Sequence, residues 1–177
     1  MKEHLGLTHI YCGNGKGKTT ASLGIVLRSI GCKFNIVITQ FLKDNDSHEL
    51  DVLRTFDNVT IISGKGVNGF TKFMKDSDLE KVTNIQNEHL KQAIDLCNSG
   101  KCDVLVLDEI IGAVNNKTVD YEMLVDFLKN RPENIEVIMT GRNPKEELIE
   151  IADYVSEVNK VKHPFDRGIA AREGVEK

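Results

Sequence analysis

The fold is decided by the stretch Cys12-Gly13-Asn14-Gly15-Lys16-Gly17-Lys18-Thr19-Thr20, which stands between an apolar run and a helical pattern. The apolar run before it, residues 7–11, has the length and composition of a buried strand. The pattern after it, residues 18–30, has a helical period and stops at Gly31, a typical residue for a helix C-cap. A strand, a glycine-rich loop and a helix in this order predict a loop that binds phosphate groups.

The residue types of this loop suit phosphate binding. Its glycines let successive backbone N–H groups point inward without a Cβ clash, and the helix N-terminus adds its positive dipole end. Lys18 supplies a positive charge, and the Thr19 hydroxyl can ligate Mg²⁺. Cys12 replaces the first glycine of the general pattern G-x-x-x-x-G-K-[ST]. The loop therefore predicts binding of the triphosphate of a nucleotide such as ATP, by Gly13, Asn14, Gly15, Lys16, Gly17, Lys18, Thr19 and Thr20.

Strand-like and helix-like segments alternate along the rest of the chain. The strand candidates are residues 7–11, 35–40, 59–63, 104–107, 135–140 and 154–157, which are rich in Val and Ile. The helix candidates are residues 18–30, 78–98, 121–130 and 145–152. This alternation predicts an α/β protein with a mostly parallel sheet of about six strands and helices on both faces. We expect a single P-loop domain of the RecA-like type over residues 1–177, with its ligands at the carboxyl ends of the strands.

Two adjacent carboxylates follow the apolar run 104–107. Asp108 and Glu109 stand at its carboxyl end, where a parallel sheet brings them close to the phosphate loop. A carboxylate in this position binds Mg²⁺ directly or through water, and Thr19 is the third expected metal ligand. The alternative is that Asp108 caps the following helix.

Composition excludes several classes of protein. The chain has 177 residues, 40% hydrophobic and 28% charged, with a formal net charge of −4, which speaks against a general nucleic-acid binder. No apolar run approaches the roughly 20 residues that span a bilayer, and the first residues do not form a secretory signal. The four cysteines match no metal-binding spacing, which indicates free thiols in a reducing compartment. We expect a cytoplasmic protein.

Further motifs are spread along the chain after the loop. They are Arg28, Gln40-Phe41-Leu42-Lys43, Gly69-Phe70-Thr71, Leu107-Asp108-Glu109, Thr140-Gly141-Arg142, Ala152-Asp153, Lys162-His163-Pro164-Phe165-Asp166-Arg167-Gly168-Ile169 and Gly174-Val175-Glu176. Together with the loop, these motifs resemble the corrinoid adenosyltransferases of the CobA/CobO/BtuR type, which also carry a residue other than glycine at the position of Cys12. The similarity extends over nearly the whole chain.

The resemblance implies an activity and a set of site residues. Members of the family transfer the 5′-deoxyadenosyl group of ATP to the Co(I) of a reduced corrinoid, release triphosphate, and act in adenosylcobalamin synthesis or salvage. It implies Mg²⁺ as cofactor, a homodimer, and a reductase such as a flavoprotein as a partner. Lys18, Thr19 and Glu109 are the expected catalytic residues, with Glu109 as the carboxylate on Mg²⁺. Contacts to the nucleotide or the corrinoid are expected from Arg28, Phe70, Arg142 and His163.

The middle loop departs from the family pattern. The family usually has Gly-Phe-Thr-Trp there, and its aromatic side chains are thought to displace the lower cobalt ligand, but Lys72 follows Thr71 and the chain has no Trp. Either Phe73 replaces the missing aromatic residue, or the substrate is a corrinoid without a lower base, or Phe70 and Phe73 only anchor the loop. Two alternative functions stay open: a phosphotransferase or NTPase with the same loop, and a non-catalytic protein that binds a corrinoid and a nucleotide.

Overall fold

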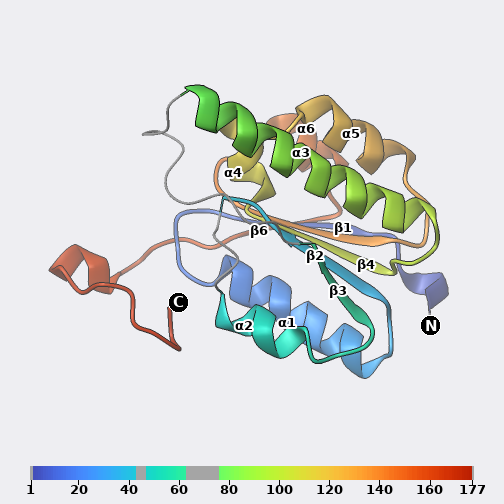
Figure 1. The fold of residues 1–177 in the computed structure, drawn as a ribbon. Coiled ribbons are helices and arrows are strands. Elements are labelled where there is room, and N and C mark those ends of the chain that lie inside the picture. The colour runs from blue at the N-terminus through green and yellow to red at the C-terminus, as the bar shows by residue number, and fades with distance from the viewer. Residues whose placement is uncertain (1, 43–46, 63–75, 177) are drawn as a thin grey trace.

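Six parallel strands form one sheet in a computed structural model that describes residues 2–42, 47–62 and 76–176. The strand order is β3-β2-β4-β5-β1-β6, and every neighbouring pair is parallel (Figure 1). The order places β5 between β1 and β4, so that the carboxyl ends of these three strands lie side by side. The strands are β1 (Thr8–Cys12), β2 (Ile36–Gln40), β3 (Val59–Ile62), β4 (Val104–Asp108), β5 (Glu136–Thr140) and β6 (Tyr154–Glu157).

Helices cover both faces of the sheet, as the alternating pattern predicts. Helices α1 and α2 lie on one face, and α3, α4, α5 and α6 lie on the other (Figure 1). The helices are η1 (Lys2–His4), α1 (Lys18–Gly31), α2 (His48–Leu53), α3 (Asp76–Asn98), α4 (Ile110–Asn115), α5 (Tyr121–Asn130), α6 (Glu146–Ile151) and η3 (Pro164–Arg167), where η marks a 3₁₀ turn. Among the helices of the described residues, none combines the length and the hydropathy that a membrane span requires.

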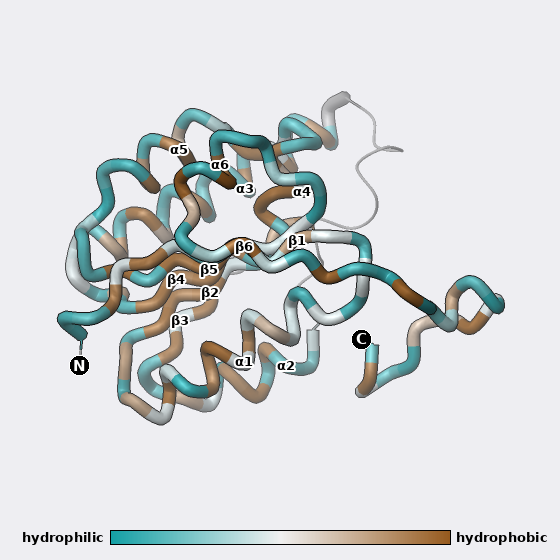
Figure 2. Tube along the Cα trace, turned by 180° about the vertical axis from the view of Figure 1, so that it is seen from behind, coloured by the Kyte–Doolittle hydropathy of each residue, from teal (hydrophilic) through white to brown (hydrophobic). Residues whose placement is uncertain are grey.

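Side chains of the central strands alternate between two apolar layers. On β4, Val104 and Val106 pack between the sheet and helices α1 and α2. Leu105 and Leu107 pack on the opposite face, between the sheet and helices α3 to α6. All five residues of β4 are buried, and so are all five of β2. The strands accordingly appear as hydrophobic bands through the middle of the molecule (Figure 2). Burial on both faces explains why these segments are continuous apolar runs.

The predicted strands and long helices are confirmed to within two residues, and the differences have local causes. Helix α1 runs one residue past its predicted end, because the N–H of Cys32 still bonds to the carbonyl of Arg28. The left-handed conformation that ends it falls on Lys33, with φ 58°, and not on Gly31. Two six-residue helices, α2 and α4, were not predicted, whereas α6, which has the same length, was predicted because it begins just after Pro144.

The segment after β6 leaves the body of the protein and then folds back. Residues 161–176 run away from the sheet and return toward the start of α1, near the phosphate loop (Figure 1). Apolar side chains along it are exposed, including Val161 at 97% and Phe165 at 72%. This segment, called the tail segment below, is therefore held by few of the apolar contacts that hold the sheet.

Candidate active site

The phosphate loop packs against the chain just after β6. The N–H of Gly15 donates to the carbonyl of Val158 at 2.7 Å, and the N–H of Val158 donates to the carbonyl of Cys12 at 2.8 Å. Gly13 has φ 103°, and a Cβ on it would lie 2.5 Å from the Val158 oxygen. Gly17, with φ 115°, turns the chain into α1. Glycine at positions 13 and 17 is thus required by backbone conformation, and position 13 also by space.

Lys18 is the first residue of α1 and is only 8% exposed. Its Nζ donates to the carbonyl oxygen of Gly15 at 2.9 Å, so the side chain curls back over the loop. Burial lowers the pKa of Lys18, and the nearby charges of Glu109 and Asp108 oppose that shift. A buried ammonium group at a helix N-terminus is an attractive partner for an incoming polyanion, because the anion would neutralise a charge that water solvates poorly.

Asp108 organises a buried cluster of hydroxyl and amide groups. Its Oδ1 accepts from the hydroxyls of Thr19 at 2.9 Å and Thr140 at 2.6 Å, and its Oδ2 accepts from Nε2 of Gln40 at 3.1 Å. Asp108 is 1% exposed. The four residues, called the Asp108 cluster below, come from the carboxyl ends of β2, β4 and β5 and from the start of α1. The fold therefore brings the predicted metal ligands Thr19 and Asp108 into direct contact, although β5 lies between β4, which bears Asp108, and β1, which precedes the loop and Thr19.

Glu109 turns the chain from β4 into α4 and faces the cleft. Its backbone has φ 61°, a left-handed conformation that costs a residue with a Cβ about 1–3 kcal/mol. The N–H of Glu109 donates to Oγ1 of Thr140 at 2.8 Å, which holds this turn. As a result Asp108 is buried against Thr19, Thr140 and Gln40, while Glu109 lines the cleft. Two adjacent carboxylates are thereby directed to two different places.

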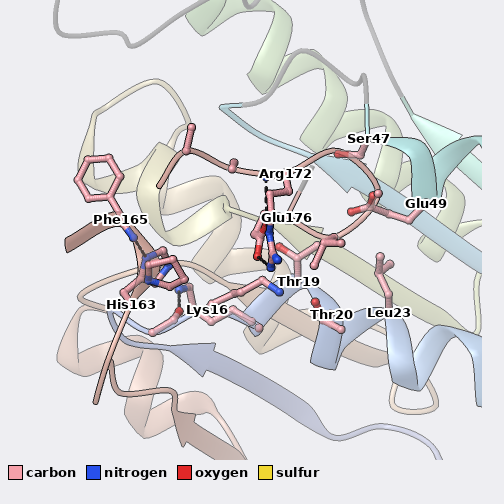
Figure 3. Close-up of a pocket in the computed structure, with 18 of the residues that line it drawn as sticks. Lys16, Thr19, Thr20, Leu23, Ser47, Glu49, His163, Phe165, Arg172 and Glu176 are labelled. Carbon is pink, nitrogen blue, oxygen red and sulfur yellow. Dashed lines mark hydrogen bonds and ion pairs between the residues drawn. The ribbon is translucent and has the colours of Figure 1, made fainter. Parts of the chain in front are cut away.

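A cleft with a volume of about 1030 Å³ opens above the phosphate loop. Its walls come from the loop, from the start of α2, from Glu109 and Arg142, and from the tail segment. That volume is at the upper end of what single small ligands occupy. Figure 3 shows Lys16 and Thr19 from the loop pointing toward the same space as Arg172 and Glu176 from the tail segment.

The tail segment brings an acidic side chain into this cleft. The Arg172 guanidinium donates to both carboxylate oxygens of Glu176, at 3.0 and 2.7 Å, and the Glu176 side chain is 16% exposed (Figure 3). These hydrogen bonds, with a smaller contribution from the charge of Lys16, lower the pKa of Glu176 to about 2. An ion pair between Arg172 and Glu176 therefore stands next to the phosphate loop.

Most of the predicted binding residues line the cleft. They are Asn14, Gly15, Lys16, Gly17, Lys18, Thr19, Thr20, Glu109, Arg142 and His163. His163 begins η3, and its Nδ1 accepts from the N–H of Phe165 at 3.1 Å. Arg142 is exposed and close enough for its charge to act on the pKa of Lys18. Gly13 supports the loop from below and does not line the cleft.

Of the remaining predicted contacts, Arg28 lies away from the cleft. Arg28 is exposed in the last turn of α1. Ten residues of helix separate it from Lys18, or about 15 Å, and Arg28 is not among the residues that line the cleft. Phe70 lies outside the described residues, and so do Lys72 and Phe73. The roles proposed for these side chains stay predictions.

The sequence did not single out Gln40, Thr140, Arg172 or Glu176 as site residues. Gln40 and Thr140 are polar residues at the last position of a buried strand, which is a signal that would have found them. Arg172 and Glu176 have no such signal, because their place in the cleft depends on how the tail segment folds back.

Three comparisons relate the chain to known proteins. A KaiC-like protein from Pyrococcus horikoshii has a similar fold, with a TM-score of 0.52 at 15% identity over 89% of this chain and 74% of that one. The corrinoid adenosyltransferase of a Sinorhizobium species is 35% identical over 97% of this chain and 80% of its own length. That of Escherichia coli K12 is 30% identical over 99% and 87%. Residues 4–176 match the model of the family described as ATP:corrinoid adenosyltransferase BtuR/CobO/CobP, and the chain belongs to that family.

Proposed function

We propose that this protein transfers the 5′-deoxyadenosyl group of ATP to the Co(I) of a reduced corrinoid and releases inorganic triphosphate. The observation that carries the proposal is the convergence of Lys18, Thr19 and Glu109 on one cleft, at the N-terminus of the helix that follows the glycine-rich loop. Membership of the adenosyltransferase family supports the same activity.

The reaction sets a specific task for the protein. The electron pair of Co(I) forms the bond to C5′ of the ribose, the C5′–O bond breaks, and its electrons leave with the triphosphate. The nucleophile belongs to the corrinoid substrate, so the protein has to supply neither a nucleophilic side chain nor a strong base. What remains is to align the reacting atoms and to stabilise the charge of the departing triphosphate.

Residues of the phosphate loop suit the second task. Lys18 brings a buried positive charge, and the amides at the start of α1 point toward the cleft. Arg142 adds another positive charge to the lining of the cleft, close enough to act on Lys18. These groups stand in place before the substrate arrives, so that little reorganisation accompanies bond breaking.

The donor set near Lys18 fits Mg²⁺. The ion prefers oxygen ligands and is usually held by one or two carboxylates together with substrate phosphates and several waters. Glu109 would hold the ion from the cleft wall, the Thr19 hydroxyl would supply a second oxygen, and Asp108 would bind through water from below. Bound there, Mg²⁺ would neutralise charge on the triphosphate.

An anaerobic assay with Co(I)-cobalamin tests the activity. Purified protein is mixed with ATP, Mg²⁺ and chemically reduced cobalamin, and the visible spectrum and the released triphosphate are followed together. We expect the cobalt–carbon product and triphosphate in equal amounts. Release of phosphate or diphosphate in place of triphosphate would favour a phosphotransferase or NTPase, and binding of both ligands without turnover would favour a non-catalytic carrier.

The wider setting belongs to the same proposal. We expect residues 1–177 to act as one domain, in the cytoplasm, as a homodimer, with Co(I) supplied by a reductase such as a flavoprotein. Mass measurement in solution tests the dimer. Replacement of the chemical reductant by a reduced flavoprotein in the same assay tests the partner.

A further inference from the structure

Gln40 ends β2 and reaches Asp108 across the neighbouring strand. The register of the sheet pairs Gln40 with Asp108, and Gln40 is 4% exposed. Its Nε2 donates to Oδ2 of Asp108 at 3.1 Å. Because an ionised carboxylate only accepts hydrogen bonds, this contact determines which end of the amide faces Asp108. The amide oxygen must therefore point away from it.

That oxygen is buried. Among the residues that the structure describes, Oε1 of Gln40 accepts no hydrogen bond. A buried acceptor left in this state costs about 1–3 kcal/mol. This acceptor lies beside the carboxylate of Asp108 and close to the Thr19 hydroxyl, which suit a divalent cation. The cost is explained if Oε1 accepts a hydrogen bond only when the cation is bound.

A neighbouring residue shows that position matters. Thr39 also has a buried hydroxyl without a partner in the described part of the chain. Successive residues of a strand point to opposite faces, so Thr39 lies on the other side of the sheet from Gln40 and Asp108. Its hydroxyl can also rotate, whereas the amide of Gln40 is held by Asp108. Gln40 therefore differs from Thr39: its unpartnered acceptor is fixed in place and belongs to the Asp108 cluster.

We propose that Gln40 is a positioning residue for the Mg²⁺ site: its Nε2 holds Asp108, and its Oε1 accepts a hydrogen bond from a water of the metal's hydration shell. The proposal rests on the proposed function, since that function brings Mg²⁺ to this place. Protein-bound Mg²⁺ keeps several waters, and groups that contact the ligands from outside commonly change metal affinity 10- to 100-fold. When Mg²⁺ is bound, both Nε2 and Oε1 of Gln40 then take part in hydrogen bonds.

Metal binding without the corrinoid tests the proposal. Mn²⁺ replaces Mg²⁺ and its binding to the protein–ATP complex is followed by electron paramagnetic resonance, while ATP binding is also measured in the presence of a chelator. Gln40→Met keeps an unbranched side chain of similar size but loses both hydrogen-bonding ends. We expect it to weaken Mn²⁺ binding about 10- to 100-fold and to leave metal-free ATP binding within about twofold.

Matched variants separate a metal-site role from a structural one. Thr39→Val removes the other unpartnered polar group of β2 and should bind Mn²⁺ like the wild type. Gln40→Leu is a second test in case Gln40→Met does not fold, and the same weakening is expected. Wild-type Mn²⁺ affinity in either Gln40 variant, or equal loss of ATP binding with and without metal, would overturn the proposal. Absence of Mn²⁺ binding by the wild-type complex would overturn the magnesium site itself, while the adenosyltransferase assay still decides the activity separately.

Discussion

A carboxylate stands at each end of the central strands: half-buried Glu136 where the strands begin (the amino edge) and buried Asp108 where they end (the carboxyl edge). The two are paired differently. At the amino edge, Oε2 of Glu136 accepts from the N–H groups of Gly6 and Leu7, and Oε1 pairs with Nε2 of His9 at 2.6 Å. At the carboxyl edge, Asp108 accepts from side chains only among the contacts described above, and its partner Gln40 keeps an unpartnered acceptor. Glu136 thus has three donors from the first residues of the chain, whereas at the carboxyl edge the amide oxygen of Gln40 has no partner among the described residues.

The difference separates what holds the fold from what binds a ligand. Hydrogen bonds from backbone N–H groups and a histidine tie Glu136 to the first residues of the chain, and they lower its pKa although burial alone would raise it. Lys18 at the other edge bears a charge that burial penalises. We therefore expect substitutions at the amino edge to affect stability, and those at the carboxyl edge to affect binding and turnover.

Lys18→Met should have the largest effect on activity. Loss of one preorganised positive group at the leaving triphosphate is expected to lower kcat/KM about 10²- to 10³-fold. Burial penalises the charge of Lys18 while the two carboxylates attract it, so the thermal midpoint should move by no more than about 3 °C. The anaerobic assay and thermal melting measure both. Lys16→Met, at an exposed position of the same loop, is the control and should cost far less; equal losses in the two variants would contradict the special place of Lys18.

Glu109→Gln and Asp108→Asn should separate the two carboxylates. Glu109 lines the cleft, so its charge can be removed with little effect on folding, and we expect Mn²⁺ affinity to fall about 10- to 100-fold. Asp108→Asn places an amide against donors and should lower both metal affinity and thermal stability. Mn²⁺ titration and thermal melting are the measurements. Unchanged metal affinity in Glu109→Gln would assign the direct ligand elsewhere.

Glu136→Gln should show the opposite behaviour from Lys18→Met. An amide cannot accept from His9 and from both backbone N–H groups at once, so the free energy of unfolding should fall by about 1–3 kcal/mol, with kcat/KM nearly unchanged. The pKa of Glu136 is lowered in the folded protein, so its contribution is present above about pH 4.5 and is lost as the pH falls through the folded pKa. Denaturant unfolding at neutral and acid pH measures this. Glu133→Gln, at an exposed site nearby, should have the same free energy of unfolding as the wild type at both pH values.

Glu176→Gln should have the smallest effect, in the direction of tighter binding. Its carboxylate stands near Lys16 in the cleft, so its removal takes away a negative charge that an incoming triphosphate would meet. We expect ATP affinity to rise about two- to fivefold at low salt, and the gain to shrink as salt is added. Calorimetric titration measures it. Glu173→Gln changes an acid of the same segment that pairs with His48; an equal gain there would mean that only net charge matters.

Elements with strong periodicity or a fixed motif could be predicted from the sequence. The phosphate loop, the six strands and the closeness of Asp108 to the loop follow from glycine spacing and from apolar runs that end in polar residues. Strand order did not follow from the chain, because pairing of β1 with β5 and β6 depends on contacts between segments more than 120 residues apart. The role of Thr140 as the bridge between Asp108 and Glu109 depends on that order.

The wall of the cleft that the tail segment forms could not be predicted from the sequence, for a different reason. Arg172 and Glu176 stand on a segment with no helical or strand period, held by exposed ion pairs such as His48 with Glu173 at 3.5 Å. Pairs of this kind contribute about 0–1 kcal/mol each. No local sequence pattern specifies such an arrangement, so the sequence indicated a family ending there but not its place in the cleft.

The distribution of the cysteines makes this enzyme convenient to label. Cys12, Cys97 and Cys102 are buried, and burial also raises the pKa of Cys12, which keeps its thiol protonated and unreactive at neutral pH. Cys32 is exposed at the far end of α1, about 20 Å from the phosphate loop. A maleimide dye should therefore attach at one site without mutagenesis, close enough to report ligand arrival by energy transfer and far enough to leave the loop undisturbed.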